Sequence, residues 1–337
     1  MTSLDRHILT LVTLAVVLVL LAGCSSVGSE AKLGLLRVNT PLREPIWVPK
    51  KEAVLALSED GQRVVRVAVG ETKPGSRAPV RSREFEDLGD NLTLSPEEPD
   101  LAYLPRPDSG RISALDTDGL RVVDNHDVGD TPSYVTLGAQ SETLFALSED
   151  GATVSGMGLE TPERIPSVGV GGSTETLLES PEKGLDPAFW TAGPAGVAFY
   201  GGNPLKRLVE GPMETADVAV DLASSQRAYI AEGNRVVTLE GDPEDFLGGR
   251  LEVMATRNVG ERVERLASDE LFVFAVTQDR LVAMRRETLK TVESVGLGRL
   301  LEREGVSSVS ISGITVGTED VYLTLEEAPY VLSIKKP

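Results

Sequence analysis

The sequence predicts an all-β fold, a seven-bladed β-propeller, from three features: an internal repeat, a series of glycines and a series of apolar runs. Residues 56–61, Ala-Leu-Ser-Glu-Asp-Gly, return unchanged as residues 146–151, an interval of 90 residues. This interval corresponds to two periods of about 45 residues, a length typical of stacked structural units. A ring of such units explains how a chain of this length can form one domain after its N-terminal segment, because each unit buries its apolar face on the next.

The glycines mark the joins between units, and the apolar runs lie between them. The glycines recur at intervals of 36 to 49 residues, as Gly89, Gly129, Gly169, Gly211, Gly260 and Gly296. The apolar, strand-like runs are residues 54–57, 101–104, 144–147, 187–191, 228–231, 271–276 and 321–325. Seven runs and six joins describe seven units.

Within each unit the pattern is that of β-structure. Residues 144–147 are continuously apolar, as expected for a strand covered on both faces. Residues 148–151 then form a tight turn whose Gly supplies the positive φ. Further strands are expected at residues 63–69, 111–115, 235–239 and 281–285. Helical spacing occurs only at residues 297–304, where we expect a loop or a single turn, so stacked units made of helices are excluded. Four short strands per unit indicate a propeller blade.

The last unit predicts how the ring closes. It offers three strands, at residues 309–316, 321–325 and 330–334, after which the chain stops. An open sheet edge exposes unpaired backbone groups, and a blade built from both termini removes such an edge. We therefore expect the propeller to span residues 33–337, with residues 33–39 as the closing strand of the last blade.

The second and third units resemble a known repeat family. A strand ending in Asp116-Thr117 is followed by the join Val128-Gly129-Asp130-Thr131-Pro132 and by a strand that enters a Gly turn. This order resembles the YVTN family of β-propeller repeats over about residues 101–169, and it weakens from Pro187 onward. The resemblance implies the propeller fold and assigns no ligand-binding residue.

The start of the chain predicts a lipoprotein. Residues 8–21 carry no charge, and Leu21, Ala22 and Gly23 then lead to Cys24, the single cysteine. A run of this length is short of the roughly 20 residues that a membrane-spanning helix needs. The ending resembles the lipobox of bacterial lipoproteins, in which the Cys becomes the N-terminus and carries acyl chains such as palmitate. We expect a signal peptide at residues 1–23 and a lipidated tether at residues 24–32; an uncleaved anchor and ordinary secretion are the alternatives.

This reading predicts a location in the cell envelope. Several acyl chains at Cys24 would anchor the protein stably to a membrane. Ser25 after the Cys would permit transfer to an outer membrane by the sorting preference of proteobacterial lipoproteins. The protein is therefore expected to be lipid-anchored, either on the extracytoplasmic face of the cytoplasmic membrane or in the outer membrane.

Composition limits the partners. The net charge is −19, and removal of the signal peptide leaves it unchanged because Asp5 and Arg6 cancel. Such a charge argues against nucleic acid as a partner. A content of 41% hydrophobic and 25% charged residues is that of a folded protein rather than a disordered one.

The reactive residues are few. His126 is the single histidine after the signal peptide, and with Cys24 lipidated a zinc site of nitrogen and sulfur ligands cannot be assembled. We expect His126 on a turn or an outer edge. Residues 116–119, Asp-Thr-Asp-Gly, fit a hairpin turn better than a calcium loop, because Arg121 stands where such a loop needs Gly. The sequence thus assigns no catalytic, cofactor-binding or metal-binding residue, and no cofactor.

Two further segments stand out. Residues 72–91 are basic and then acidic, and they are longer than a hairpin loop needs, so we expect a solvated insertion. Residues 185–200 hold Phe189, Trp190, Phe199 and Tyr200. Packing between blades is the expected role of these aromatic residues, and a patch on one rim is the alternative.

These features predict a membrane-tethered, non-catalytic binding or assembly module for a protein or an envelope polymer. The alternative is an enzyme, either a lactonase-like hydrolase or a quinone-dependent enzyme with a metal in the channel. That alternative requires carboxylates, His or Arg to converge on the channel, usually around a metal, and carboxylates from several innermost strands that meet at one point would make a calcium site. A channel lined by Ser, Thr, Ala and Gly would remove its basis. A purely structural role in the envelope is the third option.

Overall fold

The computed structural model describes residues 33–69, 78–95, 98–138, 143–179, 187–202, 204–211, 215–221, 224–241, 249–303, 305–306 and 310–337. The predicted signal peptide, the lipobox residues Leu21, Ala22 and Gly23, the lipidation site Cys24 and the tether lie outside the described residues, as does the first part of the segment 72–91. Residues Leu33–Pro337 form one compact unit.

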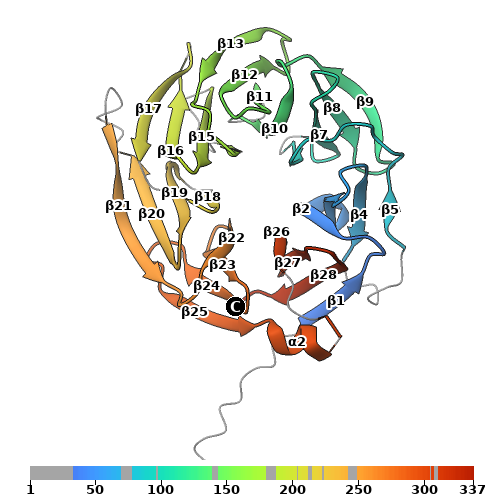
Figure 1. Ribbon diagram of the computed structural model, residues 1–337, viewed down its shortest axis with the longest axis vertical. Helices are drawn as coiled ribbons and strands as arrows, with labels where there is room; N and C mark the ends of the chain where they lie inside the picture. Colours follow the sequence, from blue (N-terminus) through green and yellow to red (C-terminus); the bar gives the residue numbers. More distant parts are fainter. Residues whose placement is uncertain are drawn as a thin grey trace, which may run out of the picture. The chain divides into compact units, whose positions relative to one another are not determined.

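This unit is a ring of seven small antiparallel sheets, which confirms the seven-bladed β-propeller (Figure 1). The outermost strands of the fourth and fifth sheets also pair with each other, in parallel, at Val209 and Gly249. Blade 1 contains β2 (Leu42–Val48), β3 (Ala53–Ser58), β4 (Val64–Ala68) and β5 (Val80–Arg81), with the 3-10 turn η1 (Pro49–Lys51) after β2. Blade 2 contains β6 (Thr93–Leu94), β7 (Leu101–Arg106), β8 (Arg111–Asp116) and β9 (Arg121–His126). Blade 3 contains β10 (Pro132–Leu137), β11 (Thr143–Ser148), β12 (Thr153–Gly158) and β13 (Arg164–Gly169).

The remaining blades follow the same order. Blade 4 contains β14 (Thr176–Glu179), β15 (Ala188–Gly193), β16 (Gly196–Gly201) and β17 (Lys206–Gly211). Blade 5 contains β18 (Val218–Asp221), β19 (Ser224–Glu232), β20 (Arg235–Gly241) and β21 (Gly249–Asn258). Blade 6 contains β22 (Val263–Ser268), β23 (Phe272–Thr277), β24 (Arg280–Arg285) and β25 (Thr291–Gly296). Blade 7 contains β26 (Ile311–Val316), β27 (Asp320–Leu325), β28 (Ala328–Lys335) and β1 (Leu33–Arg37).

The closing strand of blade 7 comes from the other end of the chain. β1 pairs antiparallel with β28, with Leu33 opposite Ile334 and Leu35 opposite Leu332. Residues 33–37 therefore take the place that the sequence predicts for residues 33–39. The two ends of the propeller are thus hydrogen-bonded in one sheet, and the ring has no open blade.

The repeated hexapeptide forms the same turn twice. Ser58 Oγ donates to Asp60 Oδ1 at 2.5 Å, and Ser148 Oγ donates to Asp150 Oδ1 at 2.6 Å. Gly61 and Gly151 follow with φ of +67° and +65°, values that residues with a Cβ rarely adopt. The identity of the two copies therefore has a structural cause, since both close the hairpin between the second and third strands of a blade.

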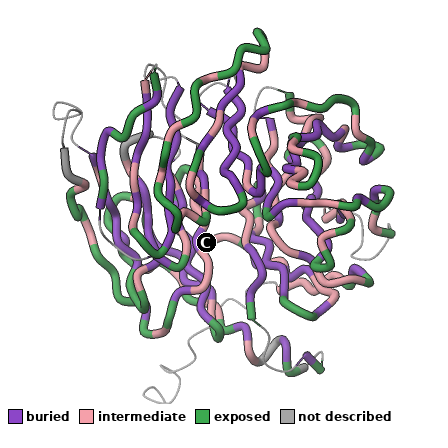
Figure 2. The backbone as a smooth tube through the Cα atoms, turned by 45° about the horizontal axis from the view of Figure 1, so that its top comes forward, coloured by how far each residue is buried: buried purple, intermediate pink, exposed green. Residues whose placement is uncertain are grey.

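The core lies between blades rather than within one. The described residues form seven hydrophobic clusters, each shared by two neighbouring blades, and buried residues follow the inner strands (Figure 2). The rings of Phe145 and Phe189 lie 4.8 Å apart across the join of blades 3 and 4. Trp190, Phe199 and Tyr200 are also buried, which confirms that the four aromatic residues pack between blades.

One helix is present among the described residues where a loop or a single turn was expected. α2 (Gly298–Arg303) spans six residues after blade 6. Leu297 and Leu301 are both buried in the cluster between blades 6 and 7, so the apolar side of this segment packs against the join of these two blades. The described residues contain no helix long and apolar enough to cross a membrane.

Candidate functional site

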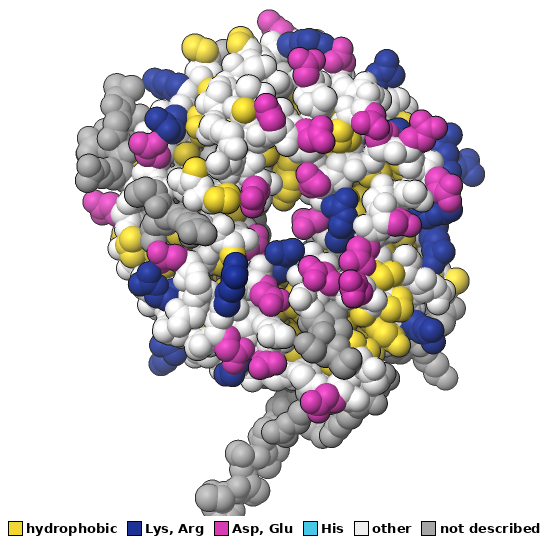
Figure 3. All heavy atoms as spheres, in the orientation of Figure 1, with side chains coloured by type: hydrophobic (Ala, Val, Ile, Leu, Met, Phe, Trp, Pro, Cys, Tyr) yellow, Lys and Arg dark blue, Asp and Glu magenta, His cyan; other side chains and the backbone are white. Residues whose placement is uncertain are grey.

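The channel holds a cavity of about 780 Å³. Residues from the innermost strands of all seven blades line it, and charged side chains of both signs surround the central opening (Figure 3). Ligand pockets commonly have volumes of about 300–1,000 Å³. The channel is thus of a size that suits a ligand.

The charged and phenolic side chains of the channel gather at one end. They belong to the first residues of an innermost strand or to the residues just before it, and they are Arg43, Glu44, Asp90, Tyr134, Glu175, Asp217 and Arg265. We call this set the channel belt. Each blade begins at its innermost strand, so these strand starts lie at the same face of the ring. The later residues of these strands are neutral, and they include Trp47, Thr136, Leu178, Ser268 and Val316.

β-bulges help to place the belt. The pairing of the first two strands slips by one residue near the start of the innermost strand in blades 1, 3, 6 and 7. Arg43, Tyr134, Arg265 and Gly313 each lie opposite the last residue but one of the second strand. A bulge turns the strand locally and re-aims its side chains. The same backbone device therefore places a long side chain at the channel in three blades.

In blade 7 the corresponding position is held by Gly313, which leaves space for the backbone of blade 1. A Cβ on Gly313 would lie 2.3 Å from Pro45 Cδ and 3.1 Å from the backbone nitrogen of Glu44. Glu44 has a φ of +48°, a left-handed conformation that is uncommon for a residue with a side chain. Gly313 thus permits the close approach of a strained segment that carries a carboxylate.

The two arginines of the belt bind backbone carbonyls. Arg43 donates from Nη1 to the Asp90 oxygen at 2.5 Å and from Nη2 to the Gly89 oxygen at 2.9 Å, which ties blade 1 to blade 2. Arg265 donates from Nη1 to the Glu264 oxygen at 3.1 Å and from Nη2 to the Ser312 oxygen at 3.4 Å. Both guanidinium groups thus hold neighbouring blades together as well as contributing charge.

Asp217 also joins two blades, 5 and 6, but as a hydrogen-bond acceptor rather than as a donor. Its Oδ2 accepts a hydrogen bond from the backbone N–H of Leu266 at 2.6 Å. Burial raises the pKa of Asp217 to about 6, against the attraction of Arg265 and the backbone donors of Leu266 and Val218. Desolvation of the carboxylate therefore outweighs the positive charge beside it.

Glu44 is the most perturbed carboxyl of the belt. Burial raises its pKa to about 7; Arg265 and Arg43 oppose this rise, while Asp217 and Asp90 add to it. The residue is partly reached by solvent, yet the surrounding protein removes most of the hydration of its carboxylate. None of the described residues donates a hydrogen bond or forms an ion pair to this carboxylate.

The phenol of Tyr134 lies among the same charged residues as the carboxyl of Glu44. Burial raises the pKa of this phenol well above the usual value, and the charges of Glu44 and Asp217 raise it further. The phenol is therefore a neutral O–H group at any physiological pH. Within the described part of the chain, no partner of this hydroxyl is recorded, so it is available to donate a hydrogen bond into the channel.

His126 and Asp116, which the sequence suggested as possible metal ligands, do not line the channel. His126 is on the outermost strand β9, with its ring 5.8 Å from that of Tyr103 and its Nε2 3.9 Å from Asp124 Oδ2. Asp116 caps a hairpin turn, since its Oδ1 accepts from the N–H of Asp118 at 3.1 Å and its Oδ2 from that of Gly119 at 2.8 Å. Both placements confirm the structural interpretation of these residues.

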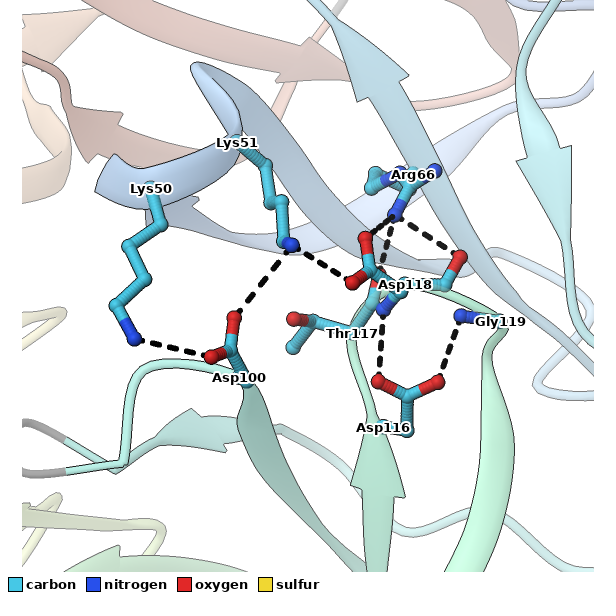
Figure 4. Close-up of polar contacts among 8 residues, drawn as sticks. All are labelled: Lys50, Lys51, Arg66, Asp100, Asp116, Thr117, Asp118 and Gly119. Carbon is cyan, nitrogen blue, oxygen red and sulfur yellow. Dashed lines mark hydrogen bonds and ion pairs between the residues drawn. The ribbon is translucent and has the colours of Figure 1, made fainter.

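Asp118 instead joins an ionic network between blades 1 and 2 (Figure 4). Lys51 Nζ lies 2.7 Å from Asp118 Oδ2, and Lys50 Nζ lies 2.9 Å from Asp100 Oδ2. Arg66 Nη1 donates to the Thr117 oxygen at 2.5 Å. The two acidic residues thus neutralise lysines of the neighbouring blade.

The channel brings together carboxylates and guanidinium groups, two of the residue types that the enzyme alternative requires. It contains carboxylates, yet no three or more His, Cys, Asp or Glu residues among those described form a group that could hold a metal ion. It also contains guanidinium groups and a phenol rather than small neutral side chains alone. What the geometry provides is a polar, charged cavity with open hydrogen-bonding groups.

The sequence did not single out the channel belt, although a signal for it existed. Each member lies within a few residues of the start of an innermost strand, shortly after the join that the repeated glycines mark. Aligning the blades on the second strand would have brought Arg43, Tyr134 and Arg265 to one position.

Comparison of the chain with models of known protein families and with curated proteins gives no match.

Proposed function

We propose that this protein is a lipid-anchored binding module of the cell envelope that takes part of a protein or envelope-polymer partner into its central channel. The observation that carries the proposal is the channel belt, in which seven side chains of six blades surround a cavity of about 780 Å³. A ring that only needed to be stable would gain from an apolar channel, because burying charged groups costs free energy.

The lipobox-like residues Leu21, Ala22, Gly23 and Cys24 support the membrane anchor. Labelled palmitate should be incorporated into the wild-type chain and should be absent from Cys24→Ser. The wild type should sediment with membranes, and the variant should not. An unlabelled wild-type chain would contradict the anchor while leaving the binding role open.

The binding role is tested by blocking the channel. Thr315 lines the channel on β26, and Thr315→Trp would fill part of the cavity. Val123→Trp is the matched control, because Val123 is 58% exposed on the outermost strand β9. Immobilised full-length protein is incubated with solubilised envelope material, and retained components are identified by mass spectrometry. The same component should be retained by the wild type and by Val123→Trp and lost with Thr315→Trp; equal retention by all three would contradict binding in the channel.

One observation favours a second function, a hydrolase. Burial raises the pKa of Glu44 to about 7, which suits a general acid or base near neutral pH. Hydrolysis of a panel of esters and lactones by the wild type, with loss in Glu44→Gln, would establish it. The related alternative with a channel metal needs a ligand group that the described residues do not form.

A further inference from the structure

We infer that the channel belt binds its ligand through an ammonium or guanidinium group, held by Glu44 together with the carboxylates of Asp90, Glu175 and Asp217. This inference rests on the proposed binding function and names the chemistry of the group that enters the channel. It follows from the balance of charge, from the way each charged group is already used, from the desolvation of Glu44 and from the neutral lining of the rest of the channel.

The balance of charge favours a cation. Among the described residues that line the cavity, four are carboxylates and two are guanidinium groups. The protein as a whole carries a net charge of −19, so the surrounding field has the same sign. A cation is attracted to such a channel and an anion is repelled.

The cations of the belt are committed to the protein, whereas the carboxylates are largely open. Arg43 and Arg265 donate to the carbonyl oxygens of Gly89, Asp90, Glu264 and Ser312. In the described part of the chain, the side-chain oxygens of Glu44, Asp90 and Glu175 have no recorded donor, and Asp217 receives backbone N–H groups only. The open groups are therefore hydrogen-bond acceptors, which match the donors of an ammonium or guanidinium group.

The two arginines of the channel belt do not offset the desolvation of the Glu44 carboxylate. Desolvation raises the pKa of this carboxyl despite the attraction of Arg265 and Arg43. A buried carboxylate without a donor is costly, and a ligand cation would remove that cost by pairing with it. The strained backbone of Glu44 is a second sign of a functional constraint, because such strain persists where the surrounding structure enforces it.

The neutral half of the channel suits the rest of such a ligand. Beyond the belt the cavity is lined by Trp47, Leu178, Val220 and Val316, with Thr136 and Ser268 between them. An apolar stem such as the methylene chain of a lysine, an arginine or a free amine can pack there while its charged end reaches Glu44. The hydroxyl of Tyr134 would donate to an acceptor group of the ligand.

The inference is tested by titration calorimetry of the full chain in detergent. The probes are agmatine and putrescine as free amines, a capped peptide with a single Lys as a protein source, and glutarate as an anionic control. Saturable binding of an amine or of the peptide, without binding of glutarate, is expected. Stronger binding of the peptide would indicate a protein partner, and stronger binding of the free amines would indicate a small ligand or an amine-bearing polymer.

Two variants identify the carboxylate. Glu44→Gln should weaken binding by about tenfold or more, because a charge-assisted pair is lost. Glu287→Gln is the control, since Glu287 is exposed and lies outside the channel lining, and it should bind like the wild type. Thermal unfolding of both variants would show that each is folded.

Proton competition supplies a further readout. Binding should weaken as the pH falls from 8 to 5, because Glu44 and Asp217, which share the channel with Arg43, Arg265 and the neutral Tyr134, become protonated. Absence of amine binding, preference for glutarate or an unchanged affinity in Glu44→Gln would overturn the inference. If Thr315→Trp still abolishes retention of the envelope component in that case, the proposed function stands and this inference alone fails.

Discussion

The side-chain amide of Asn91 pairs in both directions with the backbone of Val135. Asn91 Nδ2 donates to the Val135 oxygen at 2.8 Å, and the Val135 N–H donates to Asn91 Oδ1 at 2.8 Å. The amide thus replaces a peptide group and extends the hydrogen bonding of blade 2 to β10 of blade 3. Asn91 is buried, so water cannot replace these bonds.

Asn91→Ala should therefore destabilise the propeller by about 2–3 kcal/mol, because a buried N–H and a buried carbonyl lose their partners. Asn125→Ala in the same blade is the control, since Asn125 is exposed and, among the described residues, its side chain is bonded only through Oδ1, which accepts from Ser113 Oγ. The midpoint of urea unfolding of the full chain measures both changes. An equal effect of the two variants would contradict a special role of Asn91 in joining the blades.

Closure of the ring should contribute measurably to stability. Deletion of residues 33–37 removes β1 and leaves the edge of β28 unpaired. We expect a melting temperature lower by several degrees and self-association of the protein, because unpaired strand edges attract other strands. Deletion of residues 26–30, in the predicted tether, is the length-matched control and should change neither. Circular dichroism and light scattering measure the two effects.

Glu44 should make the protein less stable as the pH rises. Its pKa is about 7 in the folded protein and near 4.5 in an unfolded chain, so the folded state binds its proton more tightly. The stability from this proton is fully present below about pH 4.5 and is lost as the pH rises to about 7.

Replacing the carboxyl by an amide removes this loss. Glu44→Gln should be more stable than the wild type at pH 8 by on the order of 2 kcal/mol, a value reduced for the solvent that reaches the channel. The two proteins should differ little at pH 4. Urea unfolding at both pH values measures the difference, and a variant equally destabilised at pH 4 and pH 8 would contradict the linkage.

Asp221 is the centre of a buried ionic network between blades 5 and 6. Its side chain is 1% exposed and lies 3.5 Å from both Arg227 Nη1 and Arg286 Nη1, and the hydroxyl of Tyr229 donates to its Oδ2 at 2.8 Å. Asp221→Ala should cost about 3 kcal/mol, because Arg286 and the hydroxyl of Tyr229 lose a buried acceptor, while Arg227 keeps Glu240 at 3.0 Å. Tyr229→Phe should cost only about 1 kcal/mol. Unfolding midpoints that reverse this order would contradict the network.

Much of the fold could be predicted because a blade is a local structure. Each unit needs a continuously apolar strand, a Gly turn and a join, and residues 144–151 show this order within eight positions. The seam could be predicted as well, because the last unit lacks a strand and residues 33–39 offer one. The helix α2 was not expected, since six residues are too few to establish a helical period.

By itself, the sequence determined the number of blades and how the ring closes, because strand and turn patterns depend on residues close together in the chain. Only the tertiary structure decided the channel belt, because Glu44, Tyr134, Asp217 and Arg265 are scores of residues apart and meet only when the ring closes. The raised pKa of Glu44 was equally invisible in the sequence, because burial in the folded channel, rather than any neighbour in the chain, causes it.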